Sequence, residues 1–385
     1  MMRARTLAQI GSVSAAQWNQ LEIGGNPFLR HEFLAALEDT GCVGRAAGWI
    51  PRHLVLEQDG RLLGAVPLYK KNHSWGEFVF DWSWARAYDQ AGLPYYPKLV
   101  SMVPFSPVPG SRLLIAPDVD ASAVRRRLID ELVQQAKDGG CSSIHVLFTP
   151  QAEQQQLIEA GFLPRHDCQF HWHNRGYRTF DDFMATFRAD KRKKALRERR
   201  RIREAGIEFK TLHGAQMSAA LWETVFAFSE NTFQARGHEH YLNAEFLMRI
   251  SASLPDSVMV KLASYGNQPI AAAIFLRSDD ALYGRYWGSA ADFHSLHFET
   301  CYYQGIDYCI ENGLQRFEPG TQGEHKVPRG FEPAYTLSAH WIADARFRRA
   351  IDQYLEQERL AIDQYMASVR EHAPYRRDVA AGVDS

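Results

Sequence analysis

Residues 318–326, with the sequence EPGTQGEHK, carry carboxylates, an imidazole and an amine, the groups that general acid–base catalysis uses. Transfer of an acyl group to an amine is one reaction that such groups could serve, because it needs a base for the amine proton, a stabilised oxyanion and a protonated leaving group. Glu318 or Glu324 could accept the amine proton, and His325 could relay a proton. Lys326 could hold an anionic substrate group or the oxyanion, while the glycines let a ligand approach the backbone closely. The alternative is a structured turn in which Glu and Lys pair and His caps a strand.

Positive charge is concentrated in residues 188–203, where ten basic residues stand against two acidic ones, an excess of eight charges. Over the whole chain, 44 Lys and Arg nearly cancel 45 Asp and Glu. The thin apolar stripe of Phe187, Ala195, Leu196 and Ile202 predicts a helix that packs on one side and points most of its charge outward. Such a face can bind phosphates, and the alternative is a solvated linker helix. The candidate phosphate contacts are Lys191, Lys193, Lys194, Arg197, Arg200 and Arg201.

A segment of the first half, residues 81–112, is rich in aromatic residues and prolines. A stiff loop of this composition could line a groove for a sugar or a peptide. The alternative is packing in the core beside a proline-constrained strand. The candidate substrate-binding residues are Asp81, Tyr96, Lys98, Ser106 and Arg112 in this segment, and Arg285 in the second half.

The elements that must position these residues recur in one order along the chain. Apolar runs around polar, glycine-containing turns predict one hairpin over 53–69 and another over 258–276. Each hairpin is followed, after a connection, by an amphipathic helix that ends at glycine, over 124–137 and 298–312. A short strand then follows each helix, at 144–148 and 314–317.

Identical residues at one offset support an internal duplication. Five identical pairs are each separated by 169 positions, a period far too long for a solenoid. The pairs are Gly161 with Gly330, Phe162 with Phe331, Pro164 with Pro333, His171 with His340, and Trp172 with Trp341. We therefore predict an α/β chain (α+β) that contains two copies of one domain.

The repeated order of hairpin, helix, strand and final Gly-Phe strand resembles the GNAT acyltransferase fold, present twice. Two such halves with a basic helical insert resemble the FemAB-like family of aminoacyl transferases, in a branch described as peptidoglycan biosynthesis or recognition. The segments that carry the likeness are KRKKALRERRRIREAG at 191–206, NTFQARGHEHYLNAEFL at 231–247 and FEPGTQGEHKVPRGFEP at 317–333. The G-E-H-K wording departs from the better-known Fem enzymes, so the donor or the acceptor can differ.

The resemblance implies domain boundaries and a reaction. It implies a first GNAT-like domain over 1–177, a basic helical linker over 178–213, and a second GNAT-like domain with a C-terminal helix over 214–385. The implied reaction is N-acyl transfer from aminoacyl-tRNA to an amine-bearing small molecule or peptide, such as a peptidoglycan precursor. Family members carry a lysine shortly before a Gly-Phe pair, and Lys326 before Gly330-Phe331 is similar.

Two other functions stay open. An acyl-CoA-dependent GNAT enzyme would cradle the pyrophosphate with an R/Q-x-x-G-x-G/A turn at a helix N-terminus. Neither predicted helix is preceded by this turn. The residues before the first helix, 116–120, read APDVD, and those before the second, 294–297, read HSLH, so both lack the required glycines. The other function is a non-catalytic module that recognises peptidoglycan precursors or RNA.

Cysteine and histidine spacing argues against metal or redox chemistry. The five cysteines are scattered without C-x-x-C spacing, which is typical of a reduced, cytoplasmic protein. The histidine pairs lack further ligands for a four-coordinate site, so we expect no metal and no cofactor. The sequence also shows no signal peptide and no apolar stretch of about 18 residues, and we expect no stable membrane insertion.

Overall fold

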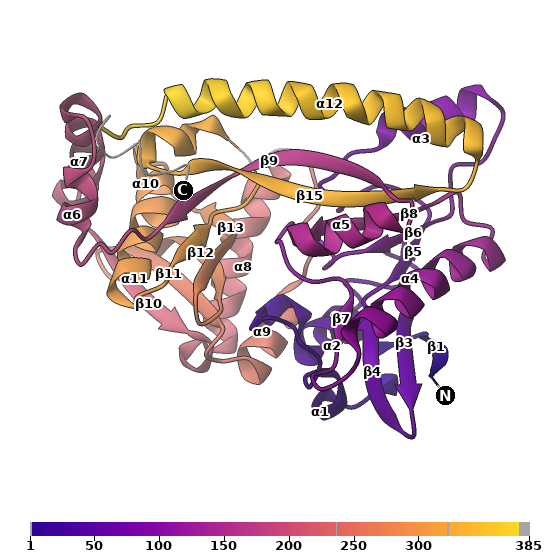
Figure 1. The fold of residues 1–385 in the computed structure, drawn as a ribbon. Helices are drawn as coiled ribbons and strands as arrows, with labels where there is room; N and C mark the ends of the chain where they lie inside the picture. The colour runs from indigo at the N-terminus through magenta and orange to yellow at the C-terminus, as the bar shows by residue number, and fades with distance from the viewer. Residues whose placement is uncertain (1, 236, 322, 377–385) are drawn as a thin grey trace. The chain divides into compact units, whose positions relative to one another are not determined.

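The computed structural model describes residues 2–235, 237–321 and 323–376, and the chain divides into two compact units (Figure 1). Unit 1 is built from the residues up to 167 together with 335–363. Unit 2 is built from 168–334 together with the described residues from 364 onward. Both units combine sheets with helices, as the sequence predicts for an α/β chain.

Unit 1 contains two groups of strands. One is a four-stranded antiparallel sheet in the order β1-β3-β4-β7, and the other has the order β15-β8-β6-β5-β2. In the second group β6 and β8 are parallel, whereas β15 pairs antiparallel with β8. The strands are β1 (Arg3–Leu7), β2 (Trp49–Pro51), β3 (His53–Gln58), β4 (Arg61–Val66), β5 (Tyr69–Lys71), β6 (Lys98–Ser101), β7 (Leu114–Ile115), β8 (Ser143–Thr149) and β15 (Glu332–Ile342).

Unit 2 repeats this plan with longer strands. Its order is β10-β11-β12-β13-β14-β9, in which β13 and β14 are parallel and β9 pairs antiparallel with β14. The strands are β9 (Leu163–His173), β10 (Ile207–His213), β11 (Val258–Tyr265), β12 (Gln268–Arg277), β13 (Ala281–Ser289) and β14 (Arg316–Glu318). Each unit therefore holds one parallel pair flanked by an antiparallel strand.

Helices cover the sheets and supply the apolar cores. In unit 1, α4 packs Val124, Leu128 and Leu132 against β3 and β4. The helices of unit 1 are α1 (Ala15–Trp18), α2 (His31–Asp39), α3 (Trp82–Gln90), α4 (Ala121–Asp138) and α5 (Gln151–Glu159), with the 3₁₀ turns η1 (Ile10–Ser12) and η2 (Pro27–Leu29). The helices of unit 2 are α6 (Phe180–Ala185), α7 (Ala189–Glu204), α8 (Ala219–Gln234), α9 (Ala244–Ser253), α10 (Leu296–Phe298) and α11 (Gln304–Glu311), with the 3₁₀ turns η3 (Gly214–Gln216) and η5 (Glu324–Arg329) and the π-helical turn η4 (Glu299–Tyr303). The last helix, α12 (Ala345–Glu371), contributes residues to both units.

The duplicated Gly-Phe strands are exchanged between the two halves of the sequence. Strand β9 comes from the first half and pairs with β14, where Trp172 faces Phe317. Strand β15 comes from the second half and pairs with β8, where Trp341 faces Ile144. Each compact unit is thus completed by a strand from the other half, and for this reason the units differ from contiguous stretches of sequence.

Most predicted elements are present. The hairpins correspond to β3–β4 and β11–β12, and the two helices to α4 and to the run α10–η4–α11. The segment 81–112 is not one loop, because it contains the helix α3 and the strand β6. Trp84 and Tyr88, four residues apart, are buried on one face of α3. Residues 178–213, predicted as a linker, lie in unit 2, and the predicted domain boundaries stay a prediction. None of the described helices is both long enough and apolar enough to cross a membrane.

Candidate functional site

Glu318 ends strand β14 with an unpaired carboxylate oxygen. The side chain is 3% exposed, and its Oε1 accepts a hydrogen bond from Arg316 Nε at 2.7 Å. Its Oε2 is buried and has no hydrogen-bond partner among the described residues. Burial raises the pKa of Glu318 to about 7, although the Arg316 guanidinium opposes this shift. An oriented carboxyl group with a pKa near neutrality is suited to accept a proton.

Lys326 lies beneath the glycine-containing loop that follows Glu318. The side chain is 2% exposed, and its Nζ donates a hydrogen bond to the Gly320 carbonyl at 2.5 Å. Burial lowers the pKa of Lys326 to about 7, so both protonation states are populated near neutral pH. Gly320 and Gly323 have positive φ angles of 96° and 101°, which residues with a side chain rarely adopt. The glycines therefore allow the chain to turn back over the amine.

The other two predicted catalytic residues of this loop are exposed. The Nε2 atom of His325 lies 2.8 Å from Tyr302 Oη, and partial desolvation of the ring lowers the pKa of His325. Glu324 accepts a hydrogen bond from Tyr365 Oη at 3.0 Å. Of the two carboxylates predicted as a base, only Glu318 is buried with a partnerless oxygen among the described residues.

Further polar side chains of unit 2 surround Glu318. Arg285, on β13, is half-buried, and burial lowers its pKa, while Tyr286 and, less strongly, the Glu318 carboxylate oppose the shift. His171, on β9, is buried, and its Nε2 lies 3.1 Å from Gln169 Oε1. Burial lowers the pKa of His171 to about 3, so the ring is neutral at physiological pH. The sequence pointed to Arg285 as a substrate-binding residue, whereas His171 stood out only as a member of the repeat and of one of the histidine pairs.

A π-helical turn, η4, lies next to Lys326. It carries Tyr302, which contacts His325, and Cys301, whose thiol has a pKa raised by burial. Single π-helical turns inside helices are frequent at functional sites. The sequence predicts one continuous helix here, because its apolar periodicity does not distinguish the wider turn.

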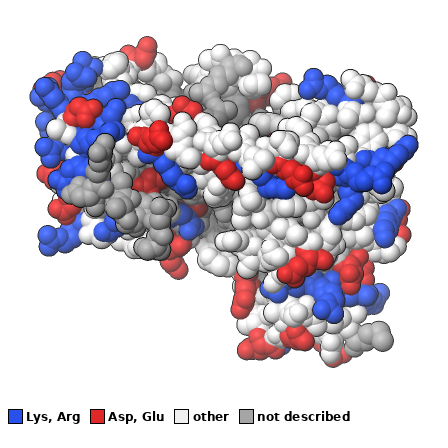
Figure 2. Space-filling model, turned by 45° about the horizontal axis from the view of Figure 1, so that its top comes forward, with Lys and Arg blue, Asp and Glu red and all other residues white. Residues whose placement is uncertain are grey.

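The outer face of the basic helix α7 lines a groove of about 980 Å³. Figure 2 shows a dense group of Lys and Arg side chains over the part of unit 2 that contains α7. Three predicted phosphate contacts line this groove, namely Lys193, Arg197 and Arg200. The three that are not among the groove residues are Lys191, Lys194 and Arg201. The groove adds the basic residues Arg192, Arg199 and Arg203 and the acidic residues Asp181 and Glu299.

The inner face of α7 is anchored by ion pairs. Glu198 is 6% exposed and accepts hydrogen bonds from Arg329 Nη2 at 2.8 and 2.9 Å and from Tyr303 Oη at 2.7 Å. Between this buried face and the groove, which Arg199 and Glu299 both line, Arg199 pairs with Glu299 at 3.2 Å and with Asp307 at 2.5 Å. Leu196, predicted to pack inward, is 41% exposed. Charged residues thus hold the helix where its apolar stripe is thin.

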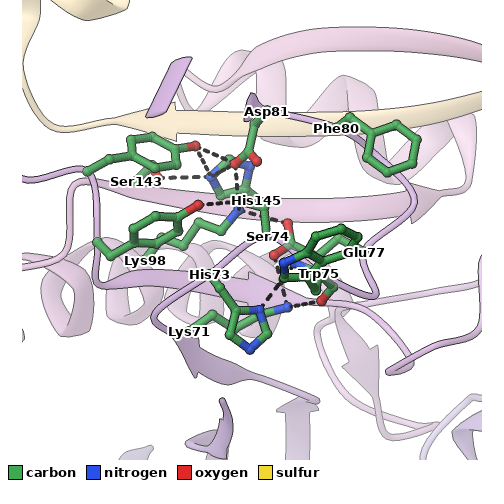
Figure 3. A network of polar contacts seen from close by, with 12 residues as sticks. Lys71, His73, Ser74, Trp75, Glu77, Phe80, Asp81, Lys98, Ser143 and His145 are labelled. Carbon is green, nitrogen blue, oxygen red and sulfur yellow. Dashed lines mark hydrogen bonds and ion pairs between the residues drawn. The ribbon is translucent and has the colours of Figure 1, made fainter. Parts of the chain in front are cut away.

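The predicted substrate residues Asp81 and Lys98 belong to a buried polar network in unit 1 (Figure 3). Lys98 Nζ donates hydrogen bonds to Ser74 Oγ at 2.8 Å, Glu77 Oε2 at 2.9 Å and Asp81 Oδ2 at 2.5 Å. Burial alone would lower the pKa of Lys98, but the two carboxylates raise it. Burial would likewise raise the pKa of Asp81, but the Lys98 ammonium lowers it. In Figure 3, Phe80 lies apart from this network.

The remaining predicted substrate residues of unit 1 lie around this network or in the core. Tyr96 is half-buried, with its Oη 2.9 Å from Ser74 Oγ, and Ser106 is 3% exposed. Arg112 is fully buried and donates to the carbonyls of Leu147, Val108 and Ser111. Its guanidinium therefore holds the proline-rich segment in place.

Solved structures share this architecture at low sequence identity. The crystal structure of FemX matches with 11% identity and a TM-score of 0.51, covering 80% of this chain and 92% of that chain. A conserved protein of unknown function from Bacteroides thetaiotaomicron matches with 7% identity and a TM-score of 0.52, covering 89% of this chain and 100% of that chain. These likenesses support the tandem GNAT-like fold alone.

Sequence comparison gives the family. The search of curated proteins found no match. A family model described as FemAB-like, peptidoglycan biosynthesis/recognition, matches residues 9–377. The two GNAT-like copies and the resemblance seen in the sequence agree with this match. The chain therefore belongs to the FemAB-like family and is an acyltransferase.

Proposed function

We propose that the protein transfers an aminoacyl group from aminoacyl-tRNA to an amine acceptor, either a peptidoglycan-precursor-like molecule or another small molecule or peptide. The observation that carries this proposal is the basic groove of α7, which lies in the same unit as the loop holding Glu318 and Lys326. Six Lys and Arg residues line the groove against two acidic residues, Asp181 and Glu299, and this excess of positive charge suits a phosphate backbone. The buried loop suits acyl transfer. Charged tRNA as the donor places the reaction in the cytoplasm.

In the proposed reaction the acceptor nitrogen attacks the carbonyl carbon of the aminoacyl ester. A C–N bond forms, the C–O bond to the ribose breaks, and the ribose hydroxyl leaves with a proton. Glu318 Oε2 receives the proton that the acceptor ammonium must lose, while Arg316 orients the carboxylate. Because an aminoacyl ester is already activated, positioning supplies much of the rate.

Lys326 acts in its protonated form, as the cation that stabilises the oxyanion of the tetrahedral intermediate. Its burial excludes water, and this strengthens the electrostatic effect of the ammonium. His325, exposed beside Tyr302, relays the second proton of the attacking nitrogen to the leaving ribose oxygen, which thereby departs as a hydroxyl. Arg285 holds an anionic group of the acceptor next to Glu318.

A binding titration against bulk charged tRNA at several salt concentrations tests the donor. Each phosphate contact adds roughly 0.7–0.9 to the slope of log affinity against log salt. Replacing Lys193, Arg197 and Arg200 with Gln should flatten the slope by about two and weaken binding. The control removes three positive charges from another helix, Arg125, Arg126 and Arg127 of α4, and should leave the slope within about half a unit of wild type.

Binding to acetyl-CoA is measured in parallel, because it separates the two donor classes. Salt-sensitive tRNA binding without a response to acetyl-CoA supports the proposal. Saturable CoA binding without affinity for tRNA contradicts it and makes the protein an ordinary N-acyltransferase. Transfer of a labelled aminoacyl group to a mixture of amines and peptidoglycan precursors then identifies the acceptor.

A further inference from the structure

We propose that the buried ion pair between Glu198 and Arg329 is a positioning device, which couples the basic helix α7 to the turn that carries His325 and Lys326. The inference rests on the proposed function, because it takes this turn as part of the reaction site. It adds two positioning residues that lie outside the predicted catalytic set and outside the groove. Their contacts link the two parts of unit 2 that the reaction needs together.

Glu198 is a carboxylate in the middle of a strongly basic helix, yet it faces inward. It shares the buried face with Ala195 and Ile202, three and four residues away, as helical periodicity requires. A buried carboxylate is unfavourable unless it is paired and hydrogen-bonded. Here the pairing comes from Arg329 and Tyr303, so the position of α7 fixes where the Arg329 guanidinium lies.

Arg329 extends this link to the turn η5. Its Nη2 binds the Glu198 carboxylate, and its Nη1 donates to the His325 carbonyl at 2.6 Å. The guanidinium lies over the ring of Phe298 at 3.4 Å and is 4% exposed. A planar guanidinium with contacts on these sides has little freedom, so it holds the backbone that immediately precedes Lys326.

The opposite face of α7 carries the groove residues. Arg197 precedes Glu198 directly, and Arg200 lies one half-turn further on, so the phosphate-binding face and the buried carboxylate belong to one rigid helical turn. Arg199 fixes the same turn to Glu299 of η4, the element that also supplies Tyr302. An RNA that holds the outer face therefore stabilises the contacts that keep His325 and Lys326 in place.

The test must remove the ion pair without leaving one buried charge alone. Removing a single partner is strongly destabilising, whereas replacing both partners with apolar residues of similar volume is often tolerated. The test variant is therefore the double substitution Glu198→Leu with Arg329→Met. The matched control is Arg165→Met with Glu358→Leu, because this pair is also bidentate, at 2.7 and 2.7 Å, and lies in unit 1, whereas η5 belongs to unit 2.

Hydrogen exchange of the amides of residues 324–331 reads the position of the turn without any turnover. In the full-length protein without RNA, we expect at least fivefold faster exchange in the test variant than in wild type, and wild-type exchange in the control. With bulk tRNA, wild type and control should gain at least fivefold protection of this turn, and the test variant should not. Equal exchange of wild type and test variant overturns the inference.

Kinetics distinguish positioning from simple stabilisation. At saturating aminoacyl-tRNA, kcat of the test variant should fall at least tenfold, while KM for aminoacyl-tRNA stays within threefold because the groove is intact. Wild-type kcat in a folded test variant contradicts the inference. A wild-type protein without transfer activity contradicts the proposed function, and the exchange of the turn in RNA-free protein still decides the coupling.

Discussion

Glu318 and Lys326 are both buried, and burial moves their pKa values toward each other. The carboxyl group becomes a weaker acid and the ammonium a stronger one, so both have a pKa of about 7. The proposed mechanism needs Glu318 deprotonated and Lys326 protonated. Activity should rise as the pH increases through the pKa of Glu318 and fall as it passes the pKa of Lys326. A narrow maximum near pH 7 follows from these two groups.

Substitution of Lys326 tests the alkaline side of this profile. An arginine stays protonated over the whole accessible range, so Lys326→Arg should retain activity above pH 8, where wild type declines. Lys326→Met removes the cation and should lower kcat by roughly 100-fold, as loss of one oxyanion-stabilising group does. The pH dependence of kcat measures both effects, and Lys210→Met on β10 serves as an exposed control. A declining limb that persists in Lys326→Arg would contradict the role of the ammonium.

We predict that Lys98 contributes to the stability of unit 1. Lys98→Met leaves Glu77 and Asp81 buried without the ammonium between them, and a broken buried pair costs roughly 3–5 kcal/mol. Urea unfolding should show this loss, with Lys137→Met at the exposed end of α4 as the control. A variant of unchanged stability that fails to bind the acceptor would instead support the substrate-binding role.

The same network gives stability a pH dependence. The pKa of Asp81 is lower in the folded protein than the value of about 3.9 in an unfolded chain. Its contribution is therefore present above pH 4 and is lost as the pH falls through the folded-state pKa. Lys98→Met should show a weaker loss of stability between pH 4 and 2 than wild type.

At the scale of single residues, the sequence indicates which side chains could take part in a reaction but not which residues they contact. The loop 318–326 was recognisable because its polar residues are neighbours in the chain. Arg316 was overlooked, although it lies only two residues before Glu318 on the same strand. Tyr302 and the Glu198–Arg329 pair could not be inferred, because their contacts join residues 23 and 131 positions apart.

At the scale of elements, the strand pairings show how the two copies differ. The repeat relates Trp172 to Trp341, and these tryptophans face Phe317 and Ile144. The residue after Phe317 on β14 is Glu318, and the residue after Ile144 on β8 is His145. Glu318 of unit 2 therefore corresponds to His145 of unit 1. His145 is closed in by the rings of Trp84 and His340, whereas one oxygen of Glu318 is partnerless among the described residues. This asymmetry favours unit 2 as the reacting copy.

The contact of α8 with β13 gives a prediction for a single glycine. A Cβ atom at Gly288 would lie 2.0 Å from the Phe228 carbonyl group of α8, a distance that requires the helix to move. Gly288→Ala should therefore lower the free energy of unfolding by about 1–3 kcal/mol, as overpacking does. Gly11→Ala is the matched control, because its Cβ meets nothing within 4 Å. Equal unfolding midpoints for both variants would contradict this close packing.

Local periodicity predicted elements well where their apolar pattern is strong. Residues 124–137 read as an amphipathic helix, and the structure places α4 there. The strand exchange could not be predicted, because alternation identifies a buried strand but not its neighbour. The offset of 169 residues that Trp172 and Trp341 share with the other identical pairs indicated a duplication, but it did not show which sheet each strand joins.

At the scale of the whole molecule, the net charge gives no sign of the local basic groove, and the compact units do not follow contiguous stretches of sequence. The near-neutral chain carries a basic groove along one helix, so the test of phosphate binding has to be local. The exchange of β9 and β15 makes each half of the sequence incomplete by itself. Both features mean that the protein must be dissected by unit and not by residue number alone.

Expression of fragments tests this organisation. A fragment of residues 1–177 lacks β15, the strand that pairs with β8, and the residues of α12 that complete the core around Trp84 and Tyr88. It should therefore show no cooperative thermal transition in circular dichroism, because β8 keeps an unpaired edge and this core loses Ile351 and Leu355. Residues 1–167 joined by a flexible linker to 335–363 should unfold cooperatively, since that chain contains all of unit 1. A cooperative transition in 1–177 alone would show that the exchanged strand is dispensable and that the boundary predicted at residue 177 delimits an independently folding domain.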